Sequence, residues 1–290
     1  MNRLVDLLSL RRRFAVGLAL VAMTMTTASS EAGFVTFEAA GADPAAIAPT
    51  LDAFRAAVGG GSVAGANGSF GGLRREINWD GVPDSSADPN VLPADFFNAT
   101  SPRGVVLSTP GTGFLVSANA GSSTSTLFGF PNDFQTFSAQ KLFTAVNSNT
   151  TDVSFFVPGK STAATTSAFG VVFVDVEAAG LTKIEFFDQN NSLIYMRDAL
   201  VGGNQGLSFV GAVADAGERI SRVQLSSGLN TIVSDGVLGN PNDDIVVMDD
   251  FVFAEPAAAV PEPSSLVLAS LGLVVAIACV RFRRKARKPD

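Results

Sequence analysis

The sequence contains no histidine and only one cysteine, one tryptophan and one tyrosine among its 290 residues. Without histidine, the chain cannot build His-based metal sites or the Ser-His-Asp and Cys-His arrangements of many hydrolases. The single cysteine, Cys279, lies in an apolar run near the C-terminus. The rest of the chain therefore has no disulfide and depends on its hydrophobic core. The scarcity of tryptophan and tyrosine disfavours a lectin built on aromatic platforms.

The N-terminal segment, residues 1–32, has the composition of a targeting signal. A basic region comes first, the apolar run Phe14–Met25 follows, and small residues end the segment. This order is typical of a secretory signal peptide that signal peptidase cleaves near Ser30 or Ala32. An uncleaved N-terminal anchor is the alternative. Either reading predicts export through the inner membrane.

The C-terminal segment, residues 260–288, combines three features. The triplet Pro261, Glu262 and Pro263 cannot continue a helix or sheet, so it is expected to be extended and accessible. The uncharged apolar run 266–280 follows, and as a helix it would span about 22 Å, slightly less than a ~30 Å hydrocarbon core. We therefore predict a transmembrane helix. Its basic flank, which is expected on the cytoplasmic side, consists of Arg281, Arg283, Arg284, Lys285, Arg287 and Lys288.

The order and spacing of these features resemble the PEP-CTERM protein-sorting signal of Gram-negative bacteria. The resemblance implies that a membrane-embedded exosortase recognises Pro261, Glu262 and Pro263 and cleaves there. The protein would be membrane-anchored before sorting, and then reside at the cell surface or outside the cell. The resemblance also implies bacteria that make exopolysaccharide and biofilms. An ordinary single-pass anchor is the alternative.

Between the two signals, residues 33–256 are predicted to form the exported domain. In the mature chain, about Glu31 to Ala259, removing four basic residues of the N-terminal signal and six of the tail leaves ten Lys and Arg against 24 Asp and Glu, a net charge of about −14. Such an acidic surface disfavours nucleic acid and anionic lipid as partners. It is compatible with divalent cations and with neutral glycans, including extracellular polysaccharide.

The pattern of this domain predicts an all-β fold, an antiparallel β-sandwich or jelly roll with one short helix. Asp43–Gly61 has helical spacing and is expected to lie across one end of the sheet. Short apolar runs separated by Pro, Gly and Asn turns are typical of a sandwich. The expected strands are Phe34–Phe37, Gly104–Ser108, Gly113–Ser117, Thr136–Phe143, Asp152–Val157, Ala168–Glu177, Thr182–Asp188, Ser192–Arg197, Gly206–Val213, Arg219–Ser226 and Ile245–Phe253.

Four stretches of the domain occur in a characteristic order: Arg-Arg-Glu-Ile-Asn-Trp-Asp-Gly at 74–81, Phe-Phe-Asn-Ala-Thr-Ser-Pro-Arg-Gly at 96–104, Thr-Pro-Gly-Thr-Gly-Phe at 109–114 and Val-Val-Met-Asp-Asp-Phe at 246–251. This order resembles a recurring extracellular bacterial β domain of unassigned function. The resemblance transfers no catalytic residue.

An acidic segment near the end of the domain is a candidate calcium site. Oxygen-rich loops bind Ca²⁺ through carboxylates and carbonyls, and we select Asp243, Asp244 and Asp249 as candidate ligands. In a regular strand Asp249 and Asp250 would point to opposite faces, so one ion could not use both without a bend. A solvated acidic turn is the alternative.

The stretch 74–81 is a candidate ligand contact because Arg and Trp favour binding surfaces; Arg75, Trp79 and Asp80 are the candidates. An ion-paired strand and turn is the alternative. A glycosidase needs only two carboxyl groups, and those available are Glu76, Asp80, Glu177 and Glu185. No spacing singles out a pair, so we predict no catalytic residue and expect a non-enzymatic surface or matrix protein. A Ca²⁺-dependent carbohydrate-binding module is the principal alternative.

Overall fold

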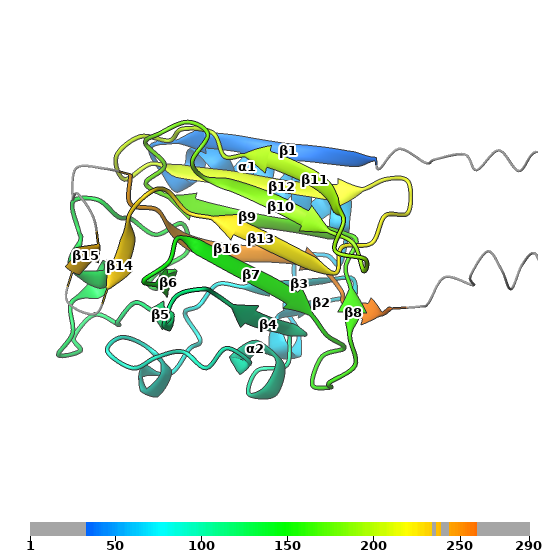
Figure 1. Cartoon of the computed structure of the whole chain (residues 1–290), viewed down its shortest axis with the longest axis horizontal. Helices are drawn as coiled ribbons and strands as arrows, with labels where there is room; N and C mark the ends of the chain where they lie inside the picture. The colour runs from blue at the N-terminus through cyan, green and yellow to red at the C-terminus, as the bar shows by residue number, and fades with distance from the viewer. Residues whose placement is uncertain (1–32, 234–235, 239–243, 260–290) are drawn as a thin grey trace, which may run out of the picture. The chain divides into compact units, whose positions relative to one another are not determined.

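The computed structural model describes residues 33–233, 236–238 and 244–259, which form two large, mainly antiparallel β-sheets (Figure 1). The predicted all-β sandwich is confirmed. The described part of the chain has ten strands in the larger sheet and five in the smaller. The predicted signal peptide, 1–32, and sorting signal, 260–288, lie outside the described residues. Their boundaries with the exported domain stay predictions.

The larger sheet runs in the order β1-β12-β9-β16-β6-β14-β15, and β2, β3 and β5 are joined to it beside this path. Strand β14 pairs parallel to β6, whereas the long central strands pair antiparallel. The bounds of its strands are β1 (Phe34–Gly41), β2 (Ser69–Phe70), β3 (Arg74–Ile77), β5 (Gly113–Val116), β6 (Phe143–Val146), β9 (Ala168–Val174), β12 (Leu207–Ala214), β14 (Thr231–Val233), β15 (Gly236–Leu238) and β16 (Val247–Ala254).

The smaller sheet runs in the order β11-β10-β13-β7-β4, and a separate pair is formed by β17 and β8. The bounds of these strands are β4 (Val105–Ser108), β7 (Thr150–Phe155), β8 (Ala164–Thr165), β10 (Lys183–Phe187), β11 (Leu193–Asp198), β13 (Arg222–Ser226) and β17 (Ala257–Ala258). The helices are α1 (Pro44–Val58), α2 (Phe96–Ala99) and the 3₁₀ turns η1 (Ala66–Gly68), η2 (Asp84–Ser86) and η3 (Thr126–Gly129).

The core between the two sheets is rich in phenylalanine. Phe169 of β9 meets Phe186 of β10 with ring centroids 6.3 Å apart, and Phe155 of β7 meets Phe253 of β16 at 5.7 Å. All four side chains are buried. Burial of each such ring contributes roughly 1.5–3 kcal/mol relative to an exposed position. Buried, mostly apolar residues at every second position of β7, β10 and β13 therefore hold the smaller sheet on the larger one.

Helix α1 covers the outer face of the larger sheet. From its sequence, this helix was expected to lie across one end of the sheet. Its Asp43 cap accepts from the Ala46 N–H at 3.1 Å, and Pro44 occupies the first turn. Phe54 packs against β12 and β9 where Gly211 lies opposite Gly170. A Cβ at Gly211 would lie 3.1 Å from the Phe54 ring, so these glycines let the helix approach closely. The helix forms a third layer and brings its C-terminal turn beside β3.

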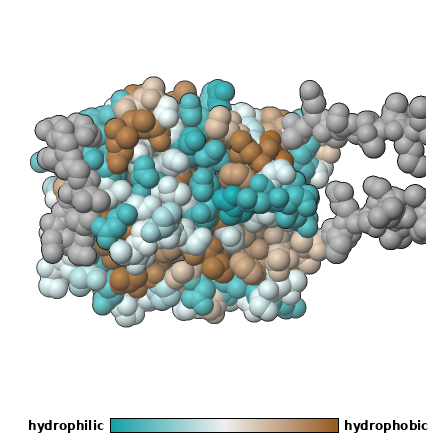
Figure 2. Space-filling model, viewed as in Figure 1, coloured by the Kyte–Doolittle hydropathy of each residue, from teal (hydrophilic) through white to brown (hydrophobic). Residues whose placement is uncertain are grey.

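Side-chain contacts join the two sheets at one edge, where β1 and β11 face each other. Arg197 binds both carboxylate oxygens of Glu38, at 2.5 and 2.6 Å, and the Tyr195 and Thr36 hydroxyls lie 2.9 Å apart. The hydrogen bond from Arg197 holds the pKa of Glu38 below its ordinary value. On the face of the molecule drawn in Figure 2, hydrophilic and hydrophobic residues are interspersed.

The predicted strand Thr136–Phe143 is wrong, because β6 begins only at Phe143. In the preceding loop, the N–H groups of 137 and 138 donate to the Asp249 carboxylate. Those of 140 and 141 donate to the Asp80 carboxylate. These donors are the ones that a strand would use in its ladder. Two acidic side chains from other elements thus compete with strand formation here.

Candidate functional site

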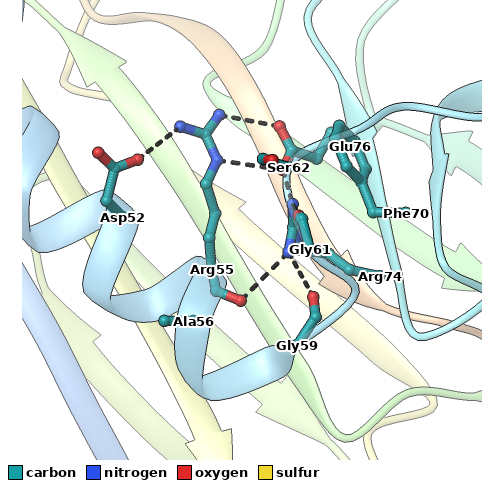
Figure 3. A pocket seen from close by; sticks show the side chains of 9 residues that line it. All are labelled: Asp52, Arg55, Ala56, Gly59, Gly61, Ser62, Phe70, Arg74 and Glu76. Carbon is teal, nitrogen blue, oxygen red and sulfur yellow. Dashed lines mark hydrogen bonds and ion pairs between the residues drawn. The ribbon is translucent and has the colours of Figure 1, made fainter.

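A pocket of about 630 Å³ opens where the C-terminal turn of α1 meets β3 (Figure 3). Its lining combines charged side chains with glycine backbone and one aromatic ring. The lining residues are Asp52, Arg55, Ala56, Gly59, Gly61, Ser62, Phe70, Arg74 and Glu76. A volume of this size falls within the range of small-ligand sites, about 300–1,000 Å³.

Arg74 builds the inner wall of the pocket by capping the helix. Its guanidinium donates to the carbonyls of Arg55, Gly59 and Gly61, the last at 2.9 Å. Gly59 is the C-cap of α1 and Gly61 lies just beyond it, so Arg74 places its charge at the end of the helix where the dipole favours a cation. Gly59 has a φ of 93°, which lets the chain leave the helix directly after Val58. Arg74 is only 3% exposed, so it is a structural cation.

Arg55 connects the helix to two strands. It binds Glu76 of β3 through Nε and Nη2 at 3.1 and 2.8 Å, and Asp250 of β16 at 3.4 Å. Its Nη1 atom reaches Asp52, one turn earlier in the helix, at 3.2 Å. Burial lowers the pKa of Arg55, but the hydrogen bond and charge of Glu76 outweigh it, so the pKa is raised above its ordinary value. The guanidinium is therefore permanently charged and is surrounded by carboxylates.

Behind this network, Asp249 and Asp250 lie side by side, because the register of β16 shifts between Met248 and Phe251. Both carboxylates contact the hydroxyl of Ser138, Asp249 at 3.1 Å and Asp250 at 2.8 Å. In a regular strand the two side chains would point to opposite faces. The register shift is the bend that the sequence analysis required for both to reach one partner. Burial raises the pKa of Asp249 well above its usual range and that of Asp250 to about 6.

The three predicted ligand contacts do not converge on the pocket. Trp79 is 1% exposed, stacks on Phe143 at 4.0 Å, and donates its ring N–H to the Asp249 carbonyl at 2.8 Å. It is a core residue, and its burial leaves no surface for a ligand. Arg75 makes a bidentate ion pair with Glu255 at 2.8 Å. The Asp80 carboxylate accepts from the backbone of the loop before β6.

The predicted calcium ligands are separated by their contacts. Asp243 lies outside the described residues. Asp244 accepts the Glu177 N–H at 2.7 Å, and its other oxygen is buried without a hydrogen bond. Asp249 instead binds the loop at Phe137. Among the described residues, no cluster of three or more acidic, histidine or cysteine side chains is placed to hold a metal ion. Calcium binding stays a prediction.

Of the four carboxylates considered for glycoside hydrolysis, Glu76 alone lines the pocket. Its Oε1 accepts from Arg55 and Arg74, and its Oε2 accepts from Arg55 again. Glu185 forms an ion pair with Lys183 on the smaller sheet at 3.2 Å. The sequence interpretation missed Arg55 and Ser138. Arg55 could have been noticed, because it is a cation one turn after Asp52 and next to the apolar stripe of the helix.

Comparison with known families identifies the C-terminal segment. The sequence profile of the PEP-CTERM protein-sorting motif matches residues 259–285. The chain carries a PEP-CTERM sorting signal. The signal marks the chain for export and for processing of its C-terminal anchor by an exosortase. No curated protein matches the sequence.

The PEP-CTERM match confirms the interpretation of the C-terminal pattern, in which Pro261, Glu262 and Pro263 precede an apolar run and a basic tail. These residues lie outside the described part of the structure, as does the predicted transmembrane helix 266–280. Among the residues that are described, no helix is long and apolar enough to cross a membrane. The last described residue, Ala259, is the first residue of the motif match.

Proposed function

We propose that this chain is a non-enzymatic surface or extracellular-matrix protein that associates with exopolysaccharide after exosortase releases it. The observation that carries the proposal is the sorting signal at 259–285, attached to a β-sandwich that has a pocket. The signal determines a destination outside the inner membrane. Neutral glycans suit the pocket better than charged ligands, for the following reason.

The charges of the pocket pair with one another. Arg55 and Arg74 lie against Glu76, and Arg55 also reaches Asp52. A pocket with two cations and two anions in mutual contact has little field to attract an ion. At its rim, the Asp52 side chain is 69% exposed and Ser62 is exposed, so a carboxylate and a hydroxyl face solvent. Such groups hydrogen-bond to sugar hydroxyls without requiring a charged partner.

The same ion pairs favour binding over catalysis. A glycosidase needs one carboxyl group that can donate a proton and another that can act as base or nucleophile. In this pocket both carboxylate oxygens of Glu76 are occupied by hydrogen bonds from two guanidinium groups. Arg55 also lies between Glu76 and Asp52, in the space that a scissile bond would need (Figure 3).

Affinity electrophoresis of the released protein tests the proposal. We expect slower migration in gels that contain neutral polysaccharides, dextran or galactomannan, and little change with the acidic polysaccharide alginate. Asp52→Ala should weaken the retention at least several-fold, and Asp198→Ala, at a comparably exposed carboxylate on β11, should leave it unchanged. Migration unaffected by every polysaccharide would contradict the glycan association.

Two further outcomes separate the alternatives. Release of reducing ends from any of these polysaccharides, abolished by Glu76→Gln, would replace the non-enzymatic proposal with a glycosidase. Retention that disappears in EDTA and returns with added Ca²⁺ would support the calcium-dependent binding module, in which Asp244 is the first residue to substitute.

A further inference from the structure

The last strand in the described part of the chain, β17, is held almost entirely by backbone hydrogen bonds. Strand β17 pairs antiparallel with β8, where Ala257 lies opposite Thr165 and Ala258 opposite Ala164. The Ala259 N–H extends this pairing to the Ala163 carbonyl at 3.2 Å. The side chains of Ala257 and Ala258 are exposed, so the strand buries little apolar surface. Such a pair belongs to the part of a structure that opens locally most often.

The residues upstream of this strand are fixed much more firmly. Pro256 is buried, and Glu255 is bound by Arg75 through two hydrogen bonds of 2.8 Å. Before them, β16 runs through the core between β9 and β3. Opening that begins at the C-terminal end would therefore stop at Pro256 and free only the short segment after it.

The sorting motif begins almost directly after the paired strand. Val260 alone separates Ala259 from Pro261. At no more than about 3.6 Å per residue, the Cα atom of Glu262 lies within about 11 Å of that of Ala259. The predicted transmembrane run starts at Leu266, within about 25 Å of Ala259 by the same rule. While the anchor is in place, this end of the fold must therefore stay close to the membrane surface.

The start of the exported domain lies at the same end of the fold. The Gly33 N–H donates to Glu218 at 2.8 Å, and the neighbouring Arg219 donates to Thr165 of β8 at 2.9 Å. Thr165 in turn pairs with Ala257 of β17. The beginning of β1 and strand β17 lie on the same side in Figure 1. We call this surface, formed by Gly33, Glu218, Arg219, β8 and β17, the exit end.

We propose that the exit end faces the exosortase, and that β17 must leave β8 before the enzyme can cleave at the motif. Enzymes that recognise peptides commonly bind them as extended strands, through backbone hydrogen bonds over several residues. Only Val260 separates Pro261 from Ala257–Ala259, whose backbone groups pair with β8 and with the Ala163 carbonyl before it. Unpairing of β17 frees residues 257–259, which supplies the extended segment before the motif.

The proposal predicts that cleavage follows the open population of this strand. When opening and closing are fast, proteolysis of a transiently opened segment depends on how often the segment is open. A covalent link between the strands should therefore stop the release of the protein. Ala164 and Ala258 are register partners, so cysteines at these positions can form a cross-strand disulfide in the oxidising periplasm.

The test compares release of the full chain in its native host, in a Cys279→Ser background that leaves no other thiol. Pulse-chase labelling measures the half-time for loss of the C-terminal segment. Ala164→Cys combined with Ala258→Cys should lengthen the half-time at least tenfold, and each single substitution should leave it unchanged. Addition of a reductant should restore cleavage of the double variant. Release of the disulfide-linked chain at the wild-type rate would overturn the proposal.

A spacer variant separates access from misfolding. Six Gly and Ser residues inserted between Ala258 and Ala259 leave the motif match 259–285 contiguous and add up to about 20 Å of extended chain. In the disulfide-linked chain this spacer should restore release, because the inserted residues provide an unpaired extended segment before the motif while β17 stays paired. A linked chain with the spacer that remains uncleaved would contradict the proposal. Failure of the wild-type chain itself to be cleaved would instead overturn the sorting function.

Discussion

Asp249 and Asp250 are neighbours in β16, and their carboxylates lie 3.1 and 2.8 Å from the same hydroxyl, that of Ser138. A serine hydroxyl has one proton to donate, so it cannot serve two ionised carboxylates at once. The second contact is favourable only when that carboxyl group carries a proton of its own. Arg55 approaches Asp250 on its other side at 3.4 Å, and Glu76 is bound to the same guanidinium.

This pair predicts a specific dependence of stability on pH. The pKa of both carboxyl groups is raised by burial, that of Asp250 to about 6, so the folded state keeps protons that the unfolded chain releases above about pH 4. The stability contributed by the pair is therefore greatest in acid. It falls as pH rises from about 4 through the raised pKa values of the two carboxyl groups, that of Asp250 being about 6.

Urea unfolding of wild type and Asp249→Asn at pH 5 and pH 8 measures this dependence. The wild type should lose more stability between the two pH values than the variant, whose amide does not titrate. Asp198→Asn, on the exposed strand β11, controls for the change in net charge and should keep the wild-type difference. Equal pH dependence in wild type and Asp249→Asn would show that the pair does not share a proton.

The second prediction concerns Arg55. Arg55→Ala leaves the buried Asp250 without its cation and leaves Glu76 with Arg74 alone. Removal of one partner from such a network should lower the free energy of unfolding by about 3 kcal/mol. The matched control is Arg197→Ala, which breaks the more exposed pair with Glu38 and should cost no more than about 1 kcal/mol. Similar losses for the two variants would contradict a structural role for the Arg55 network.

The third prediction concerns Trp79. Trp79→Phe removes the hydrogen bond to the Asp249 carbonyl and part of the stacking on Phe143, so stability should fall by roughly 1–3 kcal/mol. Retention by neutral polysaccharides should remain at the wild-type level, because the ring lies in the core. Val63→Ala, at an 81% exposed position, should change neither property. Lost retention with unchanged stability would restore Trp79 as a ligand contact.

The fold was largely accessible to sequence reasoning because its signals are local. Alternating apolar residues located β7, β10 and β13, and helical spacing with a glycine stop located α1. Residues 136–142 were misassigned because carboxylates that are distant in sequence take their backbone donors. Nothing within a short window of the chain indicates such a partner.

The candidate site was much less accessible than the fold. Arg55 and Asp250 lie 195 positions apart, so their contact follows from tertiary packing alone. The side-by-side placement of Asp249 and Asp250 depends on a register shift, and the sequence at that point contains no Gly or Pro that would indicate it. Trp79 illustrates the opposite difficulty, because a tryptophan among charged neighbours has the same pattern whether it faces solvent or the core. The sorting motif was accessible because a linear sequence carries it.

The fourth prediction concerns the sorting motif. Glu262→Ala should prevent recognition by the exosortase while leaving the exported domain unchanged, since the substitution lies beyond β17, the last strand in the described residues. Glu255→Ala provides a control at a nearby carboxylate that precedes the motif match. Because Glu255 pairs with Arg75, this control should lose some stability and still be released from the membrane.

Intact mass and fractionation of the wild type and Glu262→Ala test the sorting function most directly. We predict that the wild-type protein lacks its C-terminal segment from the Pro-Glu-Pro motif onward and is found outside the cell, and that the variant keeps the segment and stays in the membrane. If both proteins keep the complete C-terminus and remain in the inner membrane, the segment is a permanent anchor and the proposed matrix function is contradicted.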